Sequence, residues 1–267
     1  MSFRDLHRKG DPFILVNVWD RGTARVMEAL GAEALATSSA AHAFTLGRPD
    51  GTVTRDEALA HAEDIVSAVG LPVSGDFEDG YGRDPDTVAE TVRLAAEVGL
   101  AGISVEDIVP GTDDAYDADL AVERIRAAAA AARALPRDFV LVARADGVMT
   151  GSYDIDEALR RIRAFDAAGA DCLYVPMPKS VEDLQRVIDA TEKPVNVLVA
   201  GPYSKLSRQD CARMGAARLS LGGALARLTQ AAILDAGRAM LDGGDFSALA
   251  RGASGAQIDA FLRRGDA

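Results

Sequence analysis

The sequence predicts an α/β protein folded as a (β/α)8 barrel, and the order of its apolar segments is the main reason. Eight short apolar runs alternate with longer segments of helical periodicity. The runs are apolar throughout, which suits strands that are covered on both faces of a parallel sheet. Eight strand–helix units in 267 residues match this barrel closely. The expected strands are residues 13–18, 34–38, 72–76, 101–106, 139–145, 170–175, 194–199 and 217–221.

The segments between the strands carry the end signals of helices. The expected helices are residues 23–31, 54–69, 86–99, 117–134, 155–168, 180–190 and 207–214, with another that begins near 223. Asp86 and Ser180 are expected to cap two of them. Left-handed helix ends are expected at Gly31, Gly70, Gly99, Gly169 and Gly215. An open doubly wound sheet is the alternative, but the first turn, NVWDRGTAR, lacks the G-x-G-x-x-G pattern often found there.

The C-terminal segment lies outside the eightfold pattern. We expect a catalytic barrel domain over residues 1–241 and a helical extension over residues 242–267, within the same domain or at an oligomer interface. An extra helix of this kind either packs on its own barrel or reaches a neighbouring subunit.

The composition narrows the range of partners. With 48% hydrophobic and 26% charged residues, the chain has the composition of a soluble globular protein. Its net charge of −12 argues against nucleic acid and anionic membranes as partners. Because the N-terminus has no apolar segment and no run of about 20 apolar residues follows, we expect a cytoplasmic protein. Cys172 and Cys211 lack metal-ligand spacing, and Cys172 is expected to be buried.

The stretch PVSGDFEDGYG, residues 72–82, is a strand that ends in an acidic turn. Asp76 and Glu78 share one face of an extended segment, and Asp79 falls on the other face, because side chains alternate along a strand. Crowded carboxylates repel one another unless a cation or water offsets their charge. Mg²⁺ is a hard cation that binds such oxygens. The turn is therefore either a metal site or a solvated acidic loop.

Acidic and basic residues also follow the next two predicted strands. Glu106 ends the fourth strand and Arg144 the fifth. Because active sites of these barrels lie at the C-terminal ends of the strands, both residues are expected near the acidic turn. This order predicts a metal on one side of the barrel mouth and an anion-binding guanidinium on the other. The alternative for Arg144 is a structural ion pair with Asp76 or Glu106.

Residues after the first two strands have two interpretations each. Trp19 either closes the barrel top or contacts a substrate, and Asp20 either caps a helix or contacts that substrate. Of the neighbouring serines, Ser38 suits a helix cap and Ser39 a ligand for a substrate carboxylate, and both roles stay open for each. The histidines, His7, His42 and His61, are not expected to cluster, and His61 is expected at the surface.

Taken together, these motifs resemble the phosphoenolpyruvate mutase/isocitrate lyase superfamily over nearly the whole chain. Each matching segment follows a predicted strand or lies in a loop at the same rim. They are NVWD (17–20), similar to N-x-W-D; ATSSA (36–40), similar to the second-strand serine motif; GRPDGTVTRDE (47–57), similar to P-D…T; GDFEDGYG (75–82), similar to D-x-D-x-G-[FY]-G with Glu as the second acid; VED (105–107), similar to I-E-D; and ARADG (143–147), similar to A-R-[TA]-[DE].

The resemblance implies Mg²⁺, or Mn²⁺, near Asp76, Glu78 and Glu106, partly through waters. It implies catalysis through an enolate that the metal and Arg144 stabilise, with Glu106 also catalytic. It further implies homotetramers, as dimers of dimers, whose C-terminal helices are swapped between paired subunits. Binding of a small carboxylate substrate is implied for Trp19, Ser38, Ser39, Ala40, Asp50 and Arg144.

The loop after the fourth strand departs from the family pattern. Isocitrate and methylisocitrate lyases carry K-[KR]-C-G-H there, with the cysteine as general acid, and the mutases carry Lys and Asn. Here the loop reads IVPGTDDAYDAD (108–119), without cysteine, histidine or lysine, and Met177 stands near the position of a mutase histidine. A cysteine-dependent lyase is therefore not expected. Tyr116 is the loop residue nominated as catalytic proton donor.

The sequence thus predicts a Mg²⁺-dependent enzyme that cleaves a C–C bond in a small 2-oxo or 2-hydroxy carboxylate, as a lyase, decarboxylase or hydrolase. One alternative is phosphoryl rearrangement or P–C cleavage on the same metal platform. The other is a non-catalytic barrel that binds an oxo acid.

Overall fold

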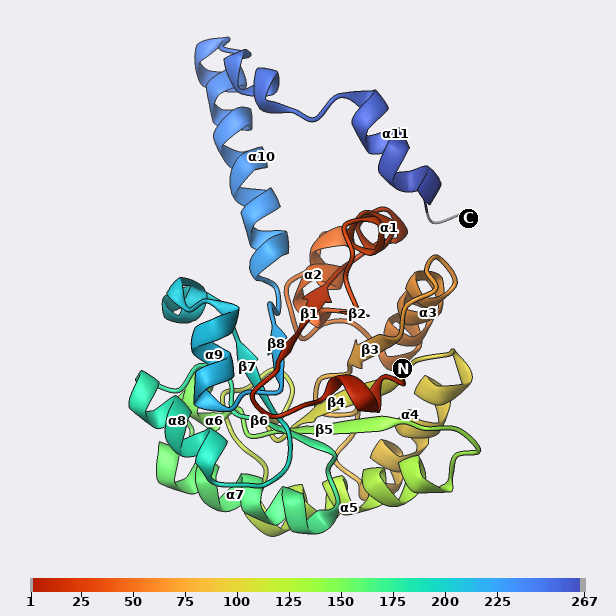
Figure 1. The fold of residues 1–267 in the computed structure, drawn as a ribbon, viewed down its shortest axis with the longest axis vertical. Coiled ribbons are helices and arrows are strands. Elements are labelled where there is room, and N and C mark those ends of the chain that lie inside the picture. Colours follow the sequence, from red (N-terminus) through yellow and green to blue (C-terminus); the bar gives the residue numbers. More distant parts are fainter. Residues whose placement is uncertain (1, 265–267) are drawn as a thin grey trace.

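The computed structural model describes residues 2–264, and its centre is a closed barrel of eight parallel strands (Figure 1). Each strand pairs with the next along the chain, and β8 pairs with β1 to close the ring. The strands are β1 (Phe13–Asn17), β2 (Ala34–Ala36), β3 (Val73–Asp76), β4 (Gly102–Glu106), β5 (Val140–Arg144), β6 (Cys172–Tyr174), β7 (Val195–Leu198) and β8 (Arg218–Ser220). The predicted fold class is confirmed, and every predicted strand is present.

Helices surround the barrel, and most follow their strand directly (Figure 1). The outer layer consists of α1 (Arg21–Ala29), α3 (Arg55–Val66), α4 (Pro85–Glu97), α5 (Ala118–Ala134), α7 (Ile155–Ala168), α8 (Val181–Asp189) and α9 (Arg208–Met214). Shorter helices lie in the connections: η1 (Arg4–Leu6), α2 (Ser39–Thr45), α6 (Gly147–Thr150) and η2 (Gly201–Lys205). The main apolar core lies between the strands and this outer layer.

Two of the predicted helix ends need correction. Ser180 caps α8 as predicted, because its hydroxyl accepts a hydrogen bond from the Asp183 N–H at 3.0 Å. Asp86 does not cap α4: Asp84 does, and Pro85 takes the first helical position, where a missing N–H leaves no bond unmade. Left-handed glycines end their helices at Gly31, Gly99, Gly169 and Gly215, but Gly70 is not left-handed because α3 ends earlier, at Ser67.

The helix after β8 leaves the barrel instead of covering it. Helix α10 (Ala224–Gly243) projects from the barrel, and η3 (Ser247–Arg251) and α11 (Gly255–Arg264) return toward α1 (Figure 1). There α11 packs on α1, and Arg25 Nη1 lies 3.4 Å from the carbonyl oxygen of Leu262. The C-terminal arm, residues 224–264, thus contacts its own barrel near both ends, and its exchange between subunits stays a prediction.

Polar residues occupy part of the barrel interior. Arg218, 3% exposed, donates from Nε to Asn196 Oδ1 at 2.9 Å, and Asn196 donates to Ser220 Oγ at 2.8 Å. Cys172 and Cys211 are buried free thiols, as expected for Cys172. Within residues 2–264, no helix is long and apolar enough to cross a membrane.

Candidate active site

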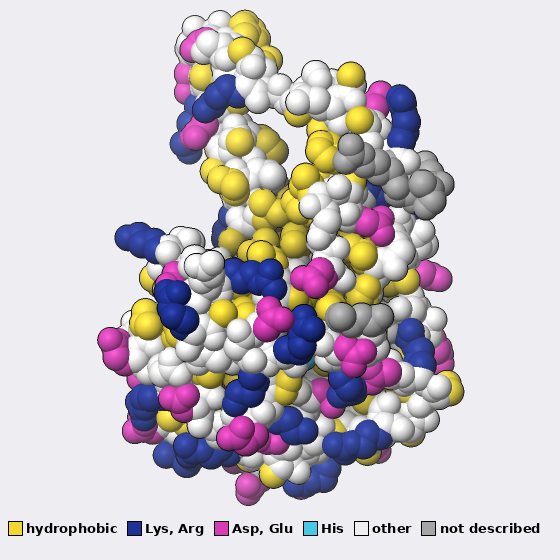
Figure 2. Space-filling model, in the orientation of Figure 1, with side chains coloured by type: hydrophobic (Ala, Val, Ile, Leu, Met, Phe, Trp, Pro, Cys, Tyr) yellow, Lys and Arg dark blue, Asp and Glu magenta, His cyan; other side chains and the backbone are white. Residues whose placement is uncertain are grey.

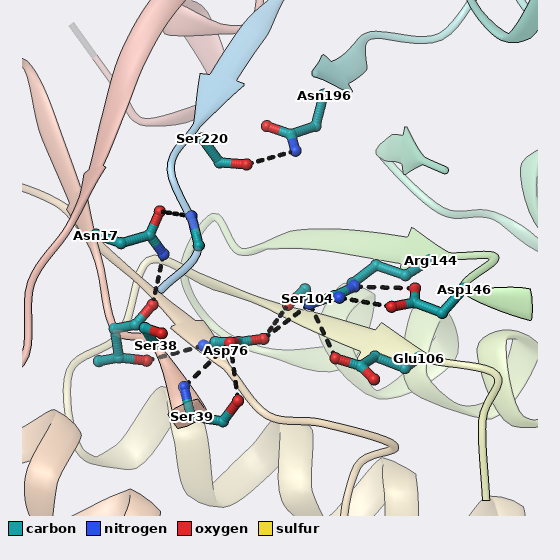
Figure 3. Close-up of polar contacts among 12 residues, drawn as sticks. Asn17, Ser38, Ser39, Asp76, Ser104, Glu106, Arg144, Asp146, Asn196 and Ser220 are labelled. Atoms are coloured by element: carbon teal, nitrogen blue, oxygen red, sulfur yellow. Dashed lines mark hydrogen bonds and ion pairs between the residues drawn. The ribbon is translucent and has the colours of Figure 1, made fainter. Parts of the chain in front are cut away.

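Three neighbouring strands end in the charged residues that the sequence singled out. Asp76, Glu106 and Arg144 are the last residues of β3, β4 and β5. Parallel pairing sets Glu106 beside Arg144 and Asp76 beside Ser104. Because parallel strands end at one rim, the three charged side chains meet at the barrel mouth (Figure 3).

Arg144 is the centre of this cluster. Its Nη1 lies 3.0 Å from Asp76 Oδ1 and 2.9 Å from Glu106 Oε1. Its Nε and Nη2 donate to the two oxygens of Asp146, at 3.1 and 2.6 Å, in a bidentate pair. The guanidinium also lies over the ring of Tyr174, 4.9 Å from its centroid. Arg144 is therefore held from several sides and is 12% exposed.

Asp76 lies between Arg144 and the start of α2 (Figure 3). Its Oδ2 accepts hydrogen bonds from the backbone N–H and the hydroxyl of Ser39, at 3.1 and 3.2 Å. Its Oδ1 accepts a bond from Ser104 Oγ at 3.3 Å. With Arg144 on the same Oδ1, both carboxylate oxygens have partners, so the Asp76 side chain is fixed.

The sequence predicted the metal-binding acids on one side of the barrel mouth and the guanidinium of Arg144 on the other. This prediction is wrong. Arg144 contacts Asp76 and Glu106 directly, as in the structural ion pair that was the alternative. A guanidinium has five N–H donors. The carboxylates of the described residues engage four of them, which leaves one Nη2 hydrogen for another oxygen. Arg144 can thus hold the acids in place and still donate toward a bound molecule.

Glu78 stands at the turn after β3 in an unusual backbone conformation. Its φ of 46° is left-handed, which is uncommon for a residue with a side chain. Its Oε1 is buried and has no hydrogen-bond partner among the described residues. Burial, together with the negative charges of Asp76, Asp50 and Asp79, raises the pKa of Glu78 to about 7. Burial likewise raises the pKa of Glu106 well above its usual value.

The carboxylates fit a divalent cation that keeps much of its water. Among the described residues, no three Asp, Glu, His or Cys side chains converge closely enough to coordinate a metal together. Mg²⁺ does not require such a cage, because it usually retains several waters and takes one or two carboxylates. The buried, unpartnered Glu78 Oε1 is an oxygen that such a hydrated ion would satisfy. Asp76, Glu78 and Glu106 therefore suit Mg²⁺ bound partly through water.

Known proteins are similar to this chain in sequence. The sequence model of the phosphoenolpyruvate phosphomutase family matches residues 3–241. The chain belongs to this family. An oxaloacetate decarboxylase of Paraburkholderia xenovorans is 32% identical over 209 residues, which are 74% of this chain and 67% of that protein.

Solved structures of this superfamily share the fold. A Burkholderia cenocepacia J2315 structure, described only as a lyase/mutase, is 44% identical with a TM-score of 0.93, over 98% of this chain and 94% of that one. The structure of 2,3-dimethylmalate lyase, a member of the phosphoenolpyruvate mutase/isocitrate lyase superfamily, is 28% identical with a TM-score of 0.84, over 97% and 93% of the two chains. Relatives of this phosphomutase-family chain thus include a decarboxylase and a lyase.

An open cavity lies beside Glu106 in this phosphomutase-family chain. Only some of the predicted substrate-binding residues line it. Ser39 and Asp50 line that cavity, whereas Trp19 and Ala40 do not. Ser38 is 2% exposed and caps α2 by accepting a bond from the Ala41 N–H, so the cap interpretation holds for it. The Ser39 N–H and hydroxyl both donate to Asp76, which makes Ser39 a positioning residue in this arrangement.

Tyr116 does not line the cavity, and its role as proton donor stays a prediction. It is 3% exposed, and its hydroxyl donates to Asp79 Oδ2 at 2.7 Å. Arg124 lies over the Tyr116 ring and also donates to the Asp79 carbonyl oxygen. Burial and the Asp79 carboxylate raise the pKa of Tyr116 to about 12, so the phenol holds its proton. The network of Asp79, Tyr116 and Arg124 instead ties the acidic turn to α5.

Replacing Tyr116 with phenylalanine tests this structural role. We expect the free energy of unfolding to fall by about 1–3 kcal/mol, because Asp79 loses a buried donor, while kcat stays within about threefold of the parent. Urea denaturation and steady-state kinetics measure the two quantities. Tyr153→Phe is a matched control, since the Tyr153 hydroxyl donates to the Asp107 carboxylate at 2.7 Å. A large loss of kcat with unchanged stability would support Tyr116 as the proton donor.

The histidine prediction is wrong in two respects. His42 and His61 stack in parallel with ring centroids 3.8 Å apart, although they belong to different helices, α2 and α3. His61 is half-buried, not at the surface, and its Nε2 is bonded to the Trp19 carbonyl oxygen at 2.8 Å. Burial lowers the pKa of His42 to about 4, so it is neutral at pH 7. The pair therefore links α2, α3 and the first strand end.

The sequence analysis includes Asp146 in the motif ARADG without giving it a role, and it leaves Ser104 out. Asp146 is fully buried and holds Arg144 from the side opposite Asp76, and among the described residues no other Lys or Arg forms an ion pair with it. One signal could have found it. Asp146 follows Arg144, the last residue of β5, by only two positions, so an acid next to the guanidinium could be read from the motif itself. Ser104 gave no such signal, because its role depends on the register between β3 and β4.

Proposed function

We propose that this chain is a Mg²⁺-dependent enzyme that cleaves the C–C bond next to the carbonyl of a small 2-oxo or 2-hydroxy carboxylate. The observation that carries the proposal is the set of acids around Arg144 at the ends of β3, β4 and β5. The decarboxylase and lyase relatives support C–C cleavage. The loop without lysine, cysteine or histidine argues against the other chemistries of the superfamily.

In this proposal Asp76, Glu78 and Glu106 hold Mg²⁺. Bound Mg²⁺ would supply positive charge that stabilises negative charge on the 2-oxo oxygen of the substrate. Ser39 and Ser104 keep the Asp76 carboxylate oriented for this task through their hydrogen bonds. Asp146 fixes the guanidinium plane of Arg144, so that its remaining N–H points to a defined place.

The protein side chains then act on the charge that cleavage creates. When the C–C bond breaks, the departing fragment leaves as a neutral molecule, either CO2 from a carboxylate or an aldehyde or ketone whose hydroxyl proton passes to water. The electron pair of the bond stays on the carbon next to the carbonyl, and the charge spreads onto the carbonyl oxygen as an enolate. The free Nη2 hydrogen of Arg144 donates to that oxygen as its charge grows. Solvent water returns a proton to the carbon, because the Glu106 carboxylate is already committed to the metal and to Arg144.

A substrate panel tests the proposed function. We expect NMR to detect cleavage of at least one member among 2-oxo acids, 2-hydroxy acids and phosphonates when Mg²⁺ is present, and no cleavage after removal of the metal with EDTA. The panel separates the alternatives. A changed ³¹P spectrum with phosphonopyruvate alone would favour P–C chemistry. Calorimetric binding of oxo acids without any product would favour a non-catalytic binding barrel.

We further propose that the C-terminal arm mediates a homotetramer of paired subunits. Large apolar side chains of the arm are exposed, and Figure 2 shows apolar atoms along it and in the space beside α1. They include Leu228, Ile233, Leu234, Leu241, Phe246 and Leu249. An extended apolar surface of this size is characteristic of a protein interface. A groove of about 520 Å³ between α2 and α10, lined by Phe44, Ala231 and Leu234, would receive the second copy.

Light scattering after gel filtration tests this assembly. The parent should have the mass of a tetramer, and Leu234→Asp should reduce it to a dimer or monomer, because the buried contact would carry an unpaired charge. Val181→Asp is the control: Val181 is also exposed, at 45%, but lies at the start of α8 away from the arm. A monomeric parent would refute the proposed assembly.

A further inference from the structure

The cavity beside Glu106 has room for more than the reacting carbons of a small oxo acid. Its volume is about 370 Å³. One wall carries Ser39, Glu78 and Glu106, the residues of the proposed reaction centre. The loop after β4, residues 108–113, supplies a second part of the lining, the loop wall.

This loop wall is built, and hydrogen bonds hold it in place. Ile108 and Ala115 form a β-bridge, and the Val109 N–H donates to the Asp114 carbonyl oxygen at 2.8 Å. The Thr112 N–H donates to the Val109 carbonyl oxygen at 3.1 Å, and its hydroxyl accepts from the Asp114 N–H. The Asp113 carbonyl oxygen accepts bonds from the hydroxyls of Thr150, the last residue of α6, and of Ser152. The loop therefore uses these donors internally.

The cavity offers no cation to the far end of a substrate. Within the described part of the chain, no Lys, Arg or His lines it. Asp50 and Asp113 add negative charge to its rim. The nearest guanidinium, Arg144, already contacts three carboxylates and lies on the side of the reaction centre. The apolar side chains of Ile108, Val109 and Pro110 complete the loop wall.

We propose that the substrate is a monocarboxylate whose end remote from the 2-oxo or 2-hydroxy group is uncharged, and that the loop wall at residues 108–113 enforces this choice. The proposal rests on the proposed function and specifies its substrate class: the remote end would leave by retro-aldol or hydrolytic cleavage, and decarboxylation of a second carboxylate is excluded. A second carboxylate in the cavity would lose water without gaining a cation, which is unfavourable. It would also be repelled by Asp113 and Asp50. An alkyl or ester end would instead contact Ile108, Val109 and Pro110.

Calorimetry with matched ligands in Mg²⁺ tests the proposal without depending on turnover. The ligands are 2-oxoglutarate, its 5-methyl ester and 2-oxohexanoate, which share the 2-oxo acid end and differ in charge at the other end. In the parent we expect the two uncharged-ended ligands to bind at least about tenfold more tightly than 2-oxoglutarate.

Two variants test whether the loop wall causes the preference for ligands with an uncharged end. Asp113→Arg adds a cation to the wall and should reduce the preference for uncharged ends by about tenfold or more. Asp114→Arg is the matched control: it makes the same charge change in the next residue, which does not line the cavity, and should leave the preference unchanged. Both side chains are exposed, so neither variant disturbs the core.

The outcomes separate this inference from the proposed function. Equal or tighter binding of 2-oxoglutarate by the parent would overturn the inference and leave the proposed function standing. An unchanged preference in Asp113→Arg would overturn the assignment of selectivity to this wall. If no oxo or hydroxy acid binds or reacts with Mg²⁺ present, the proposed function itself fails, and this inference with it.

Discussion

Replacing Arg144 with methionine should lower the free energy of unfolding by about 3–5 kcal/mol at pH 8 and abolish detectable turnover. Methionine keeps the apolar stem but removes the cation that Asp76, Glu106 and Asp146 share. Asp146 is 1% exposed, so its charge cannot turn to solvent when its partner is lost. We expect turnover to be lost because the free Nη2 hydrogen that would donate to the enolate oxygen is removed.

The pH dependence of the lost stability in Arg144→Met identifies its cause. Burial already raises the pKa of Glu106 and of Asp146 in the parent, and removal of the guanidinium raises both further. Consider a carboxyl group whose pKa is higher in the folded than in the unfolded state. It stabilises the fold at pH values below its pKa in the unfolded state, which is about 4. It loses that contribution as the pH rises through its pKa in the folded state. The free energies of unfolding of the variant and the parent should therefore differ least at pH 5 and most at pH 8.

Urea denaturation at several pH values measures this effect. Arg48→Met is the control, because Arg48 pairs with Glu57 at 2.8 Å but both side chains are more than a third exposed. That variant should lose less than about 1 kcal/mol at every pH. A loss for Arg144→Met that is equally small, or independent of pH, would show that the three carboxylates do not depend on this cation.

Replacing Asp76 with asparagine should reduce kcat at least about a hundredfold and weaken Mg²⁺ binding by about 10–100-fold. Asparagine keeps the size of the side chain and removes its charge, so the metal loses an anionic oxygen. Its amide also cannot accept at both ends, so the contact with either Ser39 or Arg144 is lost. Stability should change less than rate, since Glu106 and Asp146 still neutralise Arg144.

Metal titration by calorimetry and turnover at increasing Mg²⁺ measure the two effects separately. Asp242→Asn, at an exposed position of α10, is the control for the loss of one negative charge from the chain. Turnover at the parental rate in Asp76→Asn would refute the proposed function, because the central acid of the site would then be dispensable.

The barrel fold and the residues at the strand ends could be predicted from the sequence, because both depend on local patterns. Apolar runs and end signals placed Asp76, Glu106 and Arg144 at one rim. The partners of Arg144 were not predictable, since they depend on the register that sets Glu106 beside Arg144. The direction of α10 was equally hidden, because an apolar helix face suits a barrel surface as well as an arm.

Contacts between distant residues account for two placements that the sequence did not predict, those of Tyr116 and of the histidine pair. Tyr116 was expected over the mouth because it lies on the loop after β4. The bridge between Ile108 and Ala115 instead turns the chain back, and Tyr116 packs on Asp79, 37 residues earlier. The stacking of His42 on His61 arises from the packing of α2 against α3, which no spacing in the sequence reveals.

The left-handed backbone of Glu78 has a consequence for engineering this chain. Glycine adopts a φ of 46° without strain, whereas a residue with a side chain pays about 1 kcal/mol or more to do so. A search for thermostable variants would therefore tend to select glycine at position 78, and would remove an acid of the site in doing so. Selection for heat resistance and selection for activity should thus diverge at this single position, a trade-off between stability and function within one turn.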